Sequence, residues 1–204
     1  MSSRKLMYIA LLLLSIVPLH AEVKNNRIAL HEGWKIQSAC KVEAKGDVVS
    51  TTGFKPRGWY PTTVPMTVVA ALVNNKVYPD PYYGMNLRSL PGMDYKVGTI
   101  FTNQPMPEGS PFRCAWWYRT EFRVPLTERG KKASLHFDGI NYKASVWLNG
   151  RQIATPEQVA GSYRQYEFEV SEFLNYGKPN VLAVEITAQT ENDLGINWVD
   201  WNPS

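Results

Sequence analysis

Between residues 115 and 187 the chain repeatedly alternates apolar and polar side chains with a period of two residues, which is typical of β-strands. The longest example is "AWWYRTEFRV". One face of this stretch carries Trp116, Tyr118, Thr120, Phe122 and Val124, and the opposite face carries Trp117, Arg119, Glu121 and Arg123. The stretches "KASLHFDG", with Ala133, Leu135 and Phe137 on one face, "YEFEV" and "NVLAVEIT" alternate in the same way. The pattern predicts strand after strand.

The segment "YKASVWLNGRQIA" predicts a β-hairpin. Its two alternating halves are separated by Asn149 and Gly150. Asn-Gly accepts the positive φ angles that a two-residue type I′ turn demands. We therefore expect a tight antiparallel hairpin with these two residues at its tip.

Two segments depart from the strand pattern. "VPMTVVAALVNN" predicts a short helix, with Thr67 as N-cap, an apolar turn through Leu72 and a left-handed stop at Asn74 or Asn75. Residues 78–111 are rich in proline, glycine and tyrosine and have no clean period. A loop of that length inside a compact domain is usually functional or disordered, and its aromatic content favours a functional one.

Together these elements predict an all-β fold, an antiparallel jelly-roll β-sandwich with one short helix and a long Pro/Gly/Tyr loop. A sandwich of this type limits exposed strand edges by pairing strands across two sheets. Repeats, heptads and low-complexity tracts are absent from the sequence.

The first residues have the layout of a secretory signal peptide. Arg4 and Lys5 precede an apolar run that ends before Ala21, which stands at the expected cleavage position. The run is shorter than the ~20 residues of a membrane-spanning helix, so export is favoured over anchoring. We expect residues 1–21 to be a signal peptide, residues 22–204 to form one domain, and the mature protein to be periplasmic or extracellular.

The net charge and the spacing of the His and Cys residues argue against binding to nucleic acid, an anionic membrane or a metal ion. Removing residues 1–21 removes two of the 22 basic residues and none of the 18 acidic ones, so the net charge falls to +2. That value favours neither nucleic acid nor an anionic membrane as a partner. His31, His136, Cys40 and Cys114 have no metal-ligand spacing. Export would permit a disulfide between the two cysteines, but a chain of this size does not need one, which slightly favours buried free thiols.

The sequence carries no recognisable catalytic motif. It has no G-x-S-x-G, P-loop, H-E-x-x-H or dinucleotide fingerprint. Glu167 and Glu169 fit the solvent face of a strand, and neither they nor Asp193 and Asp200 can be paired as glycosidase carboxylates from spacing alone. We therefore expect no catalytic residue, metal or cofactor in this chain.

Aromatic and polar residues gather instead in two segments, "DPYYGMN" at residues 80–86 and "NWVDWNP" at residues 197–203. Carbohydrate sites combine apolar platforms with a few fixed polar groups, which is the composition of both segments. Other tryptophans, namely Trp34, Trp116 and Trp147, are interpreted as core residues.

Four stretches in order, "VPMTVVAALVNNKVYPDPYYGMN", "WWYRTEFRVP", "LHFDGINYKASVWLNGRQIA" and "LGINWVDWNP", resemble the N-terminal sugar-binding, galactose-binding-like domain of family 2 glycoside hydrolases. The similarity is greatest to the exo-β-glucosaminidase and β-mannosidase branch, and it covers nearly the whole mature chain. "WLNG" alone is weak evidence, since such hairpins occur in many sandwiches.

The resemblance implies a multidomain enzyme in which this jelly roll precedes an immunoglobulin-like sandwich and a (β/α)₈ barrel that carries both catalytic glutamates. The barrel is absent from this chain. By motif, contacts to the terminal β-linked sugar fall to Trp198, Asp200 and Trp201, with Asn86 and Tyr83 as weaker candidates. The partner is then carbohydrate together with a catalytic barrel.

Two other functions remain open at the level of sequence. The domain would serve as a free-standing carbohydrate-binding module, or as a structural sandwich used for protein contacts, because fold alone does not decide function. The sequence does not distinguish a mannoside, a glucosaminide and a galactoside as substrate.

Overall fold

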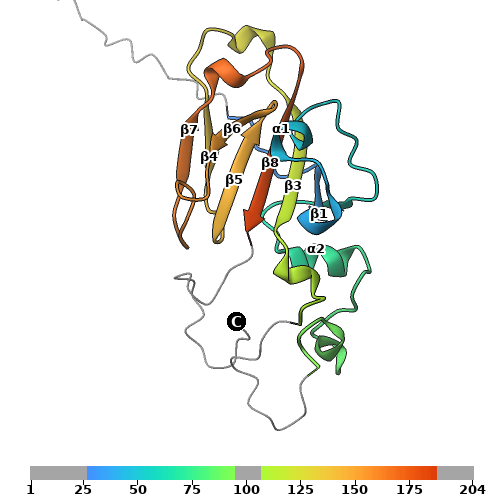
Figure 1. Cartoon of the computed structure of the whole chain (residues 1–204). Helices are drawn as coiled ribbons and strands as arrows, with labels where there is room; N and C mark the ends of the chain where they lie inside the picture. The colour runs from blue at the N-terminus through green and yellow to red at the C-terminus, as the bar shows by residue number, and fades with distance from the viewer. Residues whose placement is uncertain (1–26, 95–106, 188–204) are drawn as a thin grey trace, which may run out of the picture.

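The computed structural model describes residues 27–94 and 107–187, which form a β-sandwich with two short α-helices (Figure 1). The strands are β1 Trp34–Ser38, β2 Tyr60–Thr62, β3 Trp116–Arg123, β4 Ser134–Phe137, β5 Lys143–Leu148, β6 Arg151–Ala154, β7 Tyr166–Glu169 and β8 Pro179–Thr187. The helices are α1 Gly46–Val49 and α2 Val68–Asn74, with 3₁₀ turns η1 Ala39–Lys41, η2 Asn86–Ser89, η3 Pro111–Arg113, η4 Leu126–Glu128 and η5 Ser171–Phe173.

The strands form two sheets. Six of them lie in the order β2-β1-β3-β8-β5-β6, and β4 and β7 form a separate pair. Every strand pairing within these sheets is antiparallel. The predicted all-β, antiparallel sandwich is confirmed, and its sequence signal was the period-two alternation in β3, β4, β5, β7 and β8.

The main core lies between the two sheets. The six-stranded sheet contributes buried residues from alternate positions, among them Ile36, Tyr118 and Val146, and the β4–β7 pair contributes Leu135 and Phe168. The same core also holds Trp34 and Trp116, each 5% exposed, as predicted.

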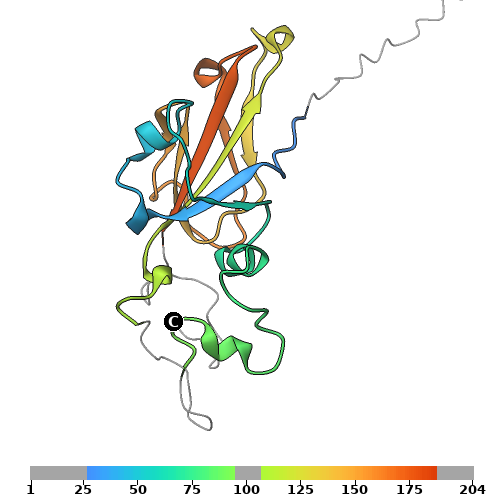
Figure 2. The same cartoon turned by 90° about the vertical axis from the view of Figure 1, so that its right-hand side faces the viewer.

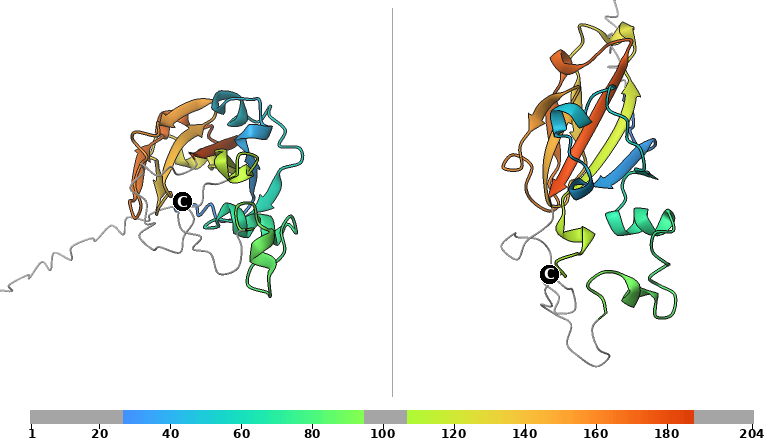
Figure 3. Two further views of the ribbon diagram at one scale, coloured as in Figure 1. Left: turned by 60° about the horizontal axis from the view of Figure 1, so that its bottom comes forward. Right: turned by 45° about the vertical axis from the view of Figure 1, so that its right-hand side comes forward.

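The opposite face of the six-stranded sheet is also covered. A second cluster joins Val49 of α1 and Trp59 to Trp117 on β3 and Ala183 on β8, with Trp147 packed against it. In Figure 1 and in the right panel of Figure 3, α1 lies across this face near β8. The helix was not predicted, because a single turn that begins at a glycine has no period to detect. Its presence explains why neither face of the first half of β3 is solvent-exposed.

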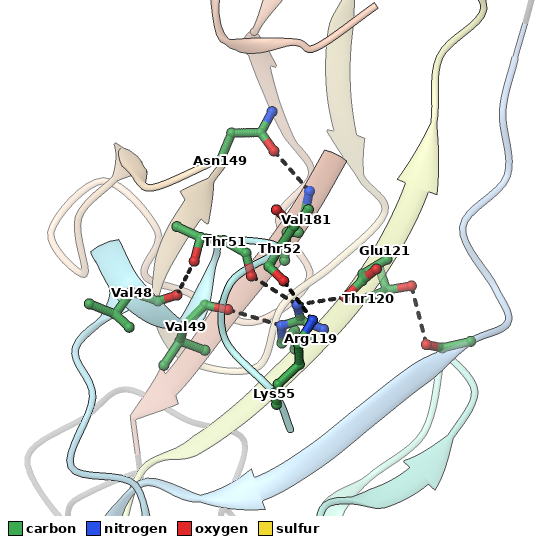
Figure 4. A network of polar contacts seen from close by, with 11 residues as sticks. Val48, Val49, Thr51, Thr52, Lys55, Arg119, Thr120, Glu121, Asn149 and Val181 are labelled. Carbon is green, nitrogen blue, oxygen red and sulfur yellow. Dashed lines mark hydrogen bonds and ion pairs between the residues drawn. The ribbon is translucent and has the colours of Figure 1, made fainter. Parts of the chain in front are cut away.

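A buried arginine fastens the α1 segment to the sheet (Figure 4). Arg119 is 3% exposed, donates from Nε to the Val49 carbonyl at 2.9 Å, and donates from Nη2 to the Thr51 carbonyl at 3.0 Å. The same Nη2 lies 2.8 Å from the carboxylate of Glu121. A buried charge needs such partners, because an unpaired one is strongly destabilising.

The hairpin between β5 and β6 is confirmed. Asn149 and Gly150 have φ angles of 51° and 85°, the positive values that a type I′ turn requires. Asn149 donates to Asn180 Oδ1 and to the Phe173 carbonyl, each at 2.7 Å, and its own Oδ1 accepts from the Val181 amide at 2.9 Å. Its side chain therefore links this turn to β8 and to η5.

The helix predicted after Thr67 is α2. The Thr67 hydroxyl accepts from the Ala70 amide at 3.2 Å, as an N-cap does. The predicted left-handed stop at Asn74 or Asn75 is wrong by one or two residues. Asn75 keeps a φ of −86°, and the positive φ of 59° belongs to Lys76. Asn75 instead uses its side-chain amide to donate to the Ala71 and Pro61 carbonyls.

The expectation of free thiols is wrong, because Cys40 and Cys114 form a disulfide. Ser38 of β1 pairs with Trp116 of β3, and the Ala39 amide donates to the Ala115 carbonyl at 2.8 Å. Continuing this antiparallel register brings Cys40 opposite Cys114, with Cα atoms 5.9 Å apart. The pairing was missed because β1 was not recognised as a strand.

The predicted signal peptide at residues 1–21 lies outside the described residues. Within residues 27–94 and 107–187, no helix combines the length and apolar character needed to cross a bilayer.

Candidate functional site

The candidate site described by the structure is the turn "DPYYGMN", residues 80–86, which lies beyond α2 at one end of the sandwich (Figure 2). The Asp80 carboxylate accepts from the Tyr82 amide at 2.9 Å. The Asp80 carbonyl accepts from the Tyr83 amide at 3.2 Å and from the Asn86 side-chain amide at 3.0 Å. Asp80 and Asn86 thus hold the turn from within, and Gly84 supplies its positive φ of 56°.

Its apolar side chains point outward. Tyr82 is 97% exposed, Tyr83 is 77% exposed and Met85 is 65% exposed. Exposed aromatic side chains on an internally bonded turn form a preorganised surface for a ligand or another domain. Tyr83 was predicted from the sequence as a contact residue, whereas Tyr82 and Met85 were not, although the two tyrosines are adjacent in the sequence.

The two ends of the long loop are anchored to the sandwich. Tyr78 and Phe112 pack with ring centroids 6.1 Å apart, which joins the start of the loop to its end. Burial, and secondarily the nearby Tyr60, raise the pKa of the Tyr78 phenol. Trp116 donates from Nε1 to the Pro111 carbonyl at 3.0 Å. The two ends of the loop that contains the turn are therefore held in place.

Of the five sequence-predicted contact residues, the structure places two. Tyr83 and Asn86 lie in the same turn, and the Asn86 amide nitrogen serves the turn itself. Trp198, Asp200 and Trp201 lie outside the described residues, so their assignment stays a prediction.

Across the part of the chain that the structure describes, no three His, Cys, Asp or Glu side chains gather as a metal site would require. Glu167 and Glu169 are exposed on β7, as the alternation predicted. The turn offers aromatic faces and a few polar groups, the composition of a surface that contacts a sugar or a neighbouring domain.

Comparison with known proteins identifies the family. Residues 111–197 match the family described as "Glycosyl hydrolase 2 galactose-binding domain-like". The matched region contains β3 to β8, and so includes most of the strands of the sandwich.

Curated relatives agree with this match. The chain is 35% identical over 170 residues to an exo-β-D-glucosaminidase of Streptomyces avermitilis, covering 83% of this chain and 17% of the relative. It is 32% identical over 169 residues to an exo-β-D-glucosaminidase of Amycolatopsis orientalis, covering 83% of this chain and 14% of the relative. The chain thus spans less than a fifth of the length of these proteins.

The crystal structure of the exo-chitosanase from Amycolatopsis orientalis superimposes with a TM-score of 0.69 at 31% identity, over 84% of this chain and 18% of that one. This similarity and the family match agree on the fold of this chain. The chain corresponds to the N-terminal galactose-binding-like domain of the family 2 glycosyl hydrolases.

Proposed function

We propose that this domain lends substrate contacts to the catalytic barrel of an exported family 2 glycosidase that acts on a terminal β-linked amino sugar. The observation that carries the proposal is the turn at residues 80–86, which exposes Tyr82 and Tyr83 while its polar groups are bonded internally. Exposed aromatic faces of this kind suit the C–H faces of a sugar ring at the edge of a neighbouring domain.

The names of the relatives favour an amino sugar as the substrate class. The Streptomyces and Amycolatopsis proteins are both named as exo-β-D-glucosaminidases. We extend that substrate class to the protein that contains this chain. Trp198, Asp200 and Trp201 are proposed as further contacts to the terminal sugar on the basis of the "NWVDWNP" motif.

The test replaces the corresponding domain of the Streptomyces avermitilis relative with this chain and measures kcat/KM on an aryl β-D-glucosaminide. Tyr83→Ala should lower kcat/KM about two- to tenfold, the value of one aromatic contact. Tyr163→Ala is the matched control, because Tyr163 is 91% exposed and lies in the β6–β7 connection. Equal losses in the two variants would contradict a specific role for the turn.

Asp200→Ala tests the second segment in the same fusion. Losing a hydrogen bond to a charged group costs about 1.5–3 kcal/mol, so kcat/KM should fall roughly 10- to 100-fold. Trp201→Ala should raise KM more than it lowers kcat, since stacking acts equally on substrate and transition state. A lower melting temperature with unchanged kcat/KM would assign both residues to domain packing instead.

The chain by itself should hydrolyse no aryl glycoside, because the two catalytic glutamates of the family lie in the barrel. Two alternatives give other outcomes. A free-standing carbohydrate-binding module that uses the turn would bind sugar without the barrel and lose that binding in Tyr83→Ala, and a structural sandwich would show no dependence on sugar in either form.

Export is part of the proposal. The signal-like residues 1–21 support it, and so does the Cys40–Cys114 disulfide, since disulfides persist in oxidising compartments. N-terminal sequencing of secreted protein should begin at Glu22. Mature protein that starts at Met1 would contradict cleavage after Ala21.

A further inference from the structure

A cavity of about 480 Å³ lies on the face of the six-stranded sheet that α1 covers. Its floor includes Trp117 of β3, Glu185 of β8 and Trp147 of β5. Its wall is residues 42–47, which comprise the segment before α1 and the first two residues of that helix. The volume falls within the range of ~300–1,000 Å³ that small-molecule sites occupy. It is separate from the turn at residues 80–86, which contributes no residue to its lining.

Strand register explains why aromatic and acidic groups meet on this floor. Trp117 pairs with Glu185, and Glu185 pairs with Ser145. Trp147 pairs with Ala183, two residues along β8 from Glu185. Side chains two residues apart on a strand share a face, so the Glu185 carboxylate lies between one tryptophan on each neighbouring strand.

Glu185 has no partner among the described residues. Its side chain is partly buried, yet no hydrogen bond or ion pair to another described residue satisfies its carboxylate. Burial raises the pKa of this carboxyl. The partly desolvated Glu185 carboxylate is therefore available to pair with a donor group that enters the cavity from outside.

The frame around the cavity is held in place. Gly46 packs against the indole of Trp147 so closely that a Cβ at this position would overlap the ring. The Ser50 hydroxyl donates to the Gly46 carbonyl at 2.6 Å and accepts from the Gly150 amide at 3.0 Å. A preorganised cavity loses little conformational entropy when a ligand binds.

The charge of the lining selects the ligand. Glu43, Asp47 and Glu185 contribute three carboxyl groups, against the single ammonium group of Lys45. Trp117 is 2% exposed, so the partly exposed Trp147 provides the aromatic surface. Acidic groups beside it suit a ligand that combines a cation with apolar C–H faces. A 2-amino sugar has both features, since its ammonium group can pair with Glu185 while the ring contacts an indole.

We propose that the cavity lined by Trp117, Trp147 and Glu185 binds one cationic amino-sugar unit, as a docking site for a glucosamine polymer. The choice of a glucosamine polymer rests on the proposed function. The site itself rests on the cavity, the unpartnered carboxylate and the tryptophans.

The test measures binding of a glucosamine tetramer to the full chain by titration calorimetry. The matched ligand is the N-acetylglucosamine tetramer, which has the same rings without the charge. Binding of the amine form should be about tenfold tighter, and Glu185→Gln should remove most of that difference, as expected for a charge-assisted hydrogen bond. Glu167→Gln, an exposed glutamate on β7, is the control and should bind like the unchanged chain.

Two further variants, Asp47→Asn in the cavity and Tyr83→Ala in the turn at residues 80–86, test where the sugar binds. Asp47→Asn on the wall should weaken binding by a smaller factor than Glu185→Gln. Unchanged affinity in Glu185→Gln, or no measurable binding of either tetramer, would overturn the proposal. Binding lost in Tyr83→Ala but retained in Glu185→Gln would also overturn it and would assign sugar binding to the turn. Conversely, an unchanged kcat/KM in the Tyr83→Ala fusion would contradict the proposed function and leave the cavity result standing.

If the cavity at Glu185 contacts another domain instead of a sugar, the expected outcome differs. In the fusion, Glu185→Gln would then lower the melting temperature while neither tetramer binds to the chain. That result would overturn the sugar site.

Discussion

Two turns can be recognised in the sequence, the Asn149–Gly150 turn and the turn at residues 80–86. Their side chains have different roles in the structure. In the first, Asn149 bonds to Phe173, Asn180 and Val181, and Asn180 is fully buried. In the second, the backbone is bonded in the same thorough way, but Tyr82 and Tyr83 project into solvent.

The difference shows how a structural loop and a presenting loop can be told apart. A structural loop uses its side chains to satisfy buried polar groups, so its residues contribute to the free energy of unfolding. A presenting loop satisfies its backbone locally and leaves its large side chains without partners within the domain. Mutations should therefore affect stability at the first loop and ligand or domain contacts at the second.

The largest expected effect tests how the long loop is anchored. Cys40→Ser with Cys114→Ser removes a cross-link between residues 74 positions apart, just after the loop returns to the sheet. The chain-entropy estimate for a closed loop of that length is about 4 kcal/mol of lost stability. Guanidinium unfolding of the double variant and the oxidised protein measures the loss. Equal midpoints would show that the bond does not restrain the unfolded chain.

Asn180→Ala should produce the next largest loss. Asn180 accepts from the Asn149 side chain and the Asn175 amide and donates to the carbonyls of Asn175 and Lys178. Leaving several of these buried groups unpaired should cost about 3 kcal/mol. Urea unfolding measures the loss, and the glycosidase activity of the fusion per folded molecule should stay constant. A loss below about 1 kcal/mol would mean that water replaces the amide.

Tyr118 links β3 to the segment that leads into α2 and the long loop, and its effect depends on pH. Its hydroxyl donates to the Met66 carbonyl at 2.9 Å, and burial raises the pKa of Tyr118 to about 12. In the unfolded chain this phenol ionises near pH 10, so between pH 10 and 12 the unfolded state holds fewer protons than the folded state. Stability is therefore full below pH 10 and falls as the pH rises towards 12.

Comparing the chain with Tyr118→Phe isolates this contribution. The unchanged protein should lose about 2 kcal/mol more than the variant between pH 9 and pH 11.5. Unfolding by urea at the two pH values measures both. Parallel losses in the two proteins would show that Tyr118 ionises without penalty in the folded state.

Tyr83→Ala should have the smallest effect on stability. Because the ring is 77% exposed, its removal should change the free energy of unfolding by no more than about 0.5 kcal/mol. Thermal unfolding of the chain by itself measures this change. A loss above 1 kcal/mol would place the ring in the domain's own packing and would weaken the comparison between the two loops.

The sequence predicted those elements whose residues carry their own signal. Asn149–Gly150 encodes its turn through backbone preference, and Thr67 encodes its helix start through a local hydrogen bond. β1 was not recognised, although Trp34 to Gln37 alternate apolar and polar residues, because a single five-residue segment is too short to give a clear strand signal. The disulfide was missed with it.

The candidate site shows the same division. The composition of residues 80–86 identified Tyr83, whereas the exposure of Tyr82 is visible only in three dimensions. The cavity at Glu185 is a product of strand register, since Trp117 and Glu185 are 68 residues apart and meet only through the pairing of β3 with β8. A local sequence pattern does not predict such a long-range contact.

The central place of β8 also governs the order in which the protein can acquire its structure during synthesis. β8 is made after the other seven strands, yet it lies between β3 and β5 and pairs with both. Until it leaves the ribosome, β1 to β3 and β5 to β6 are two partial sheets with no strand between them. We therefore expect the two partial sheets to join only after residue 187 has emerged.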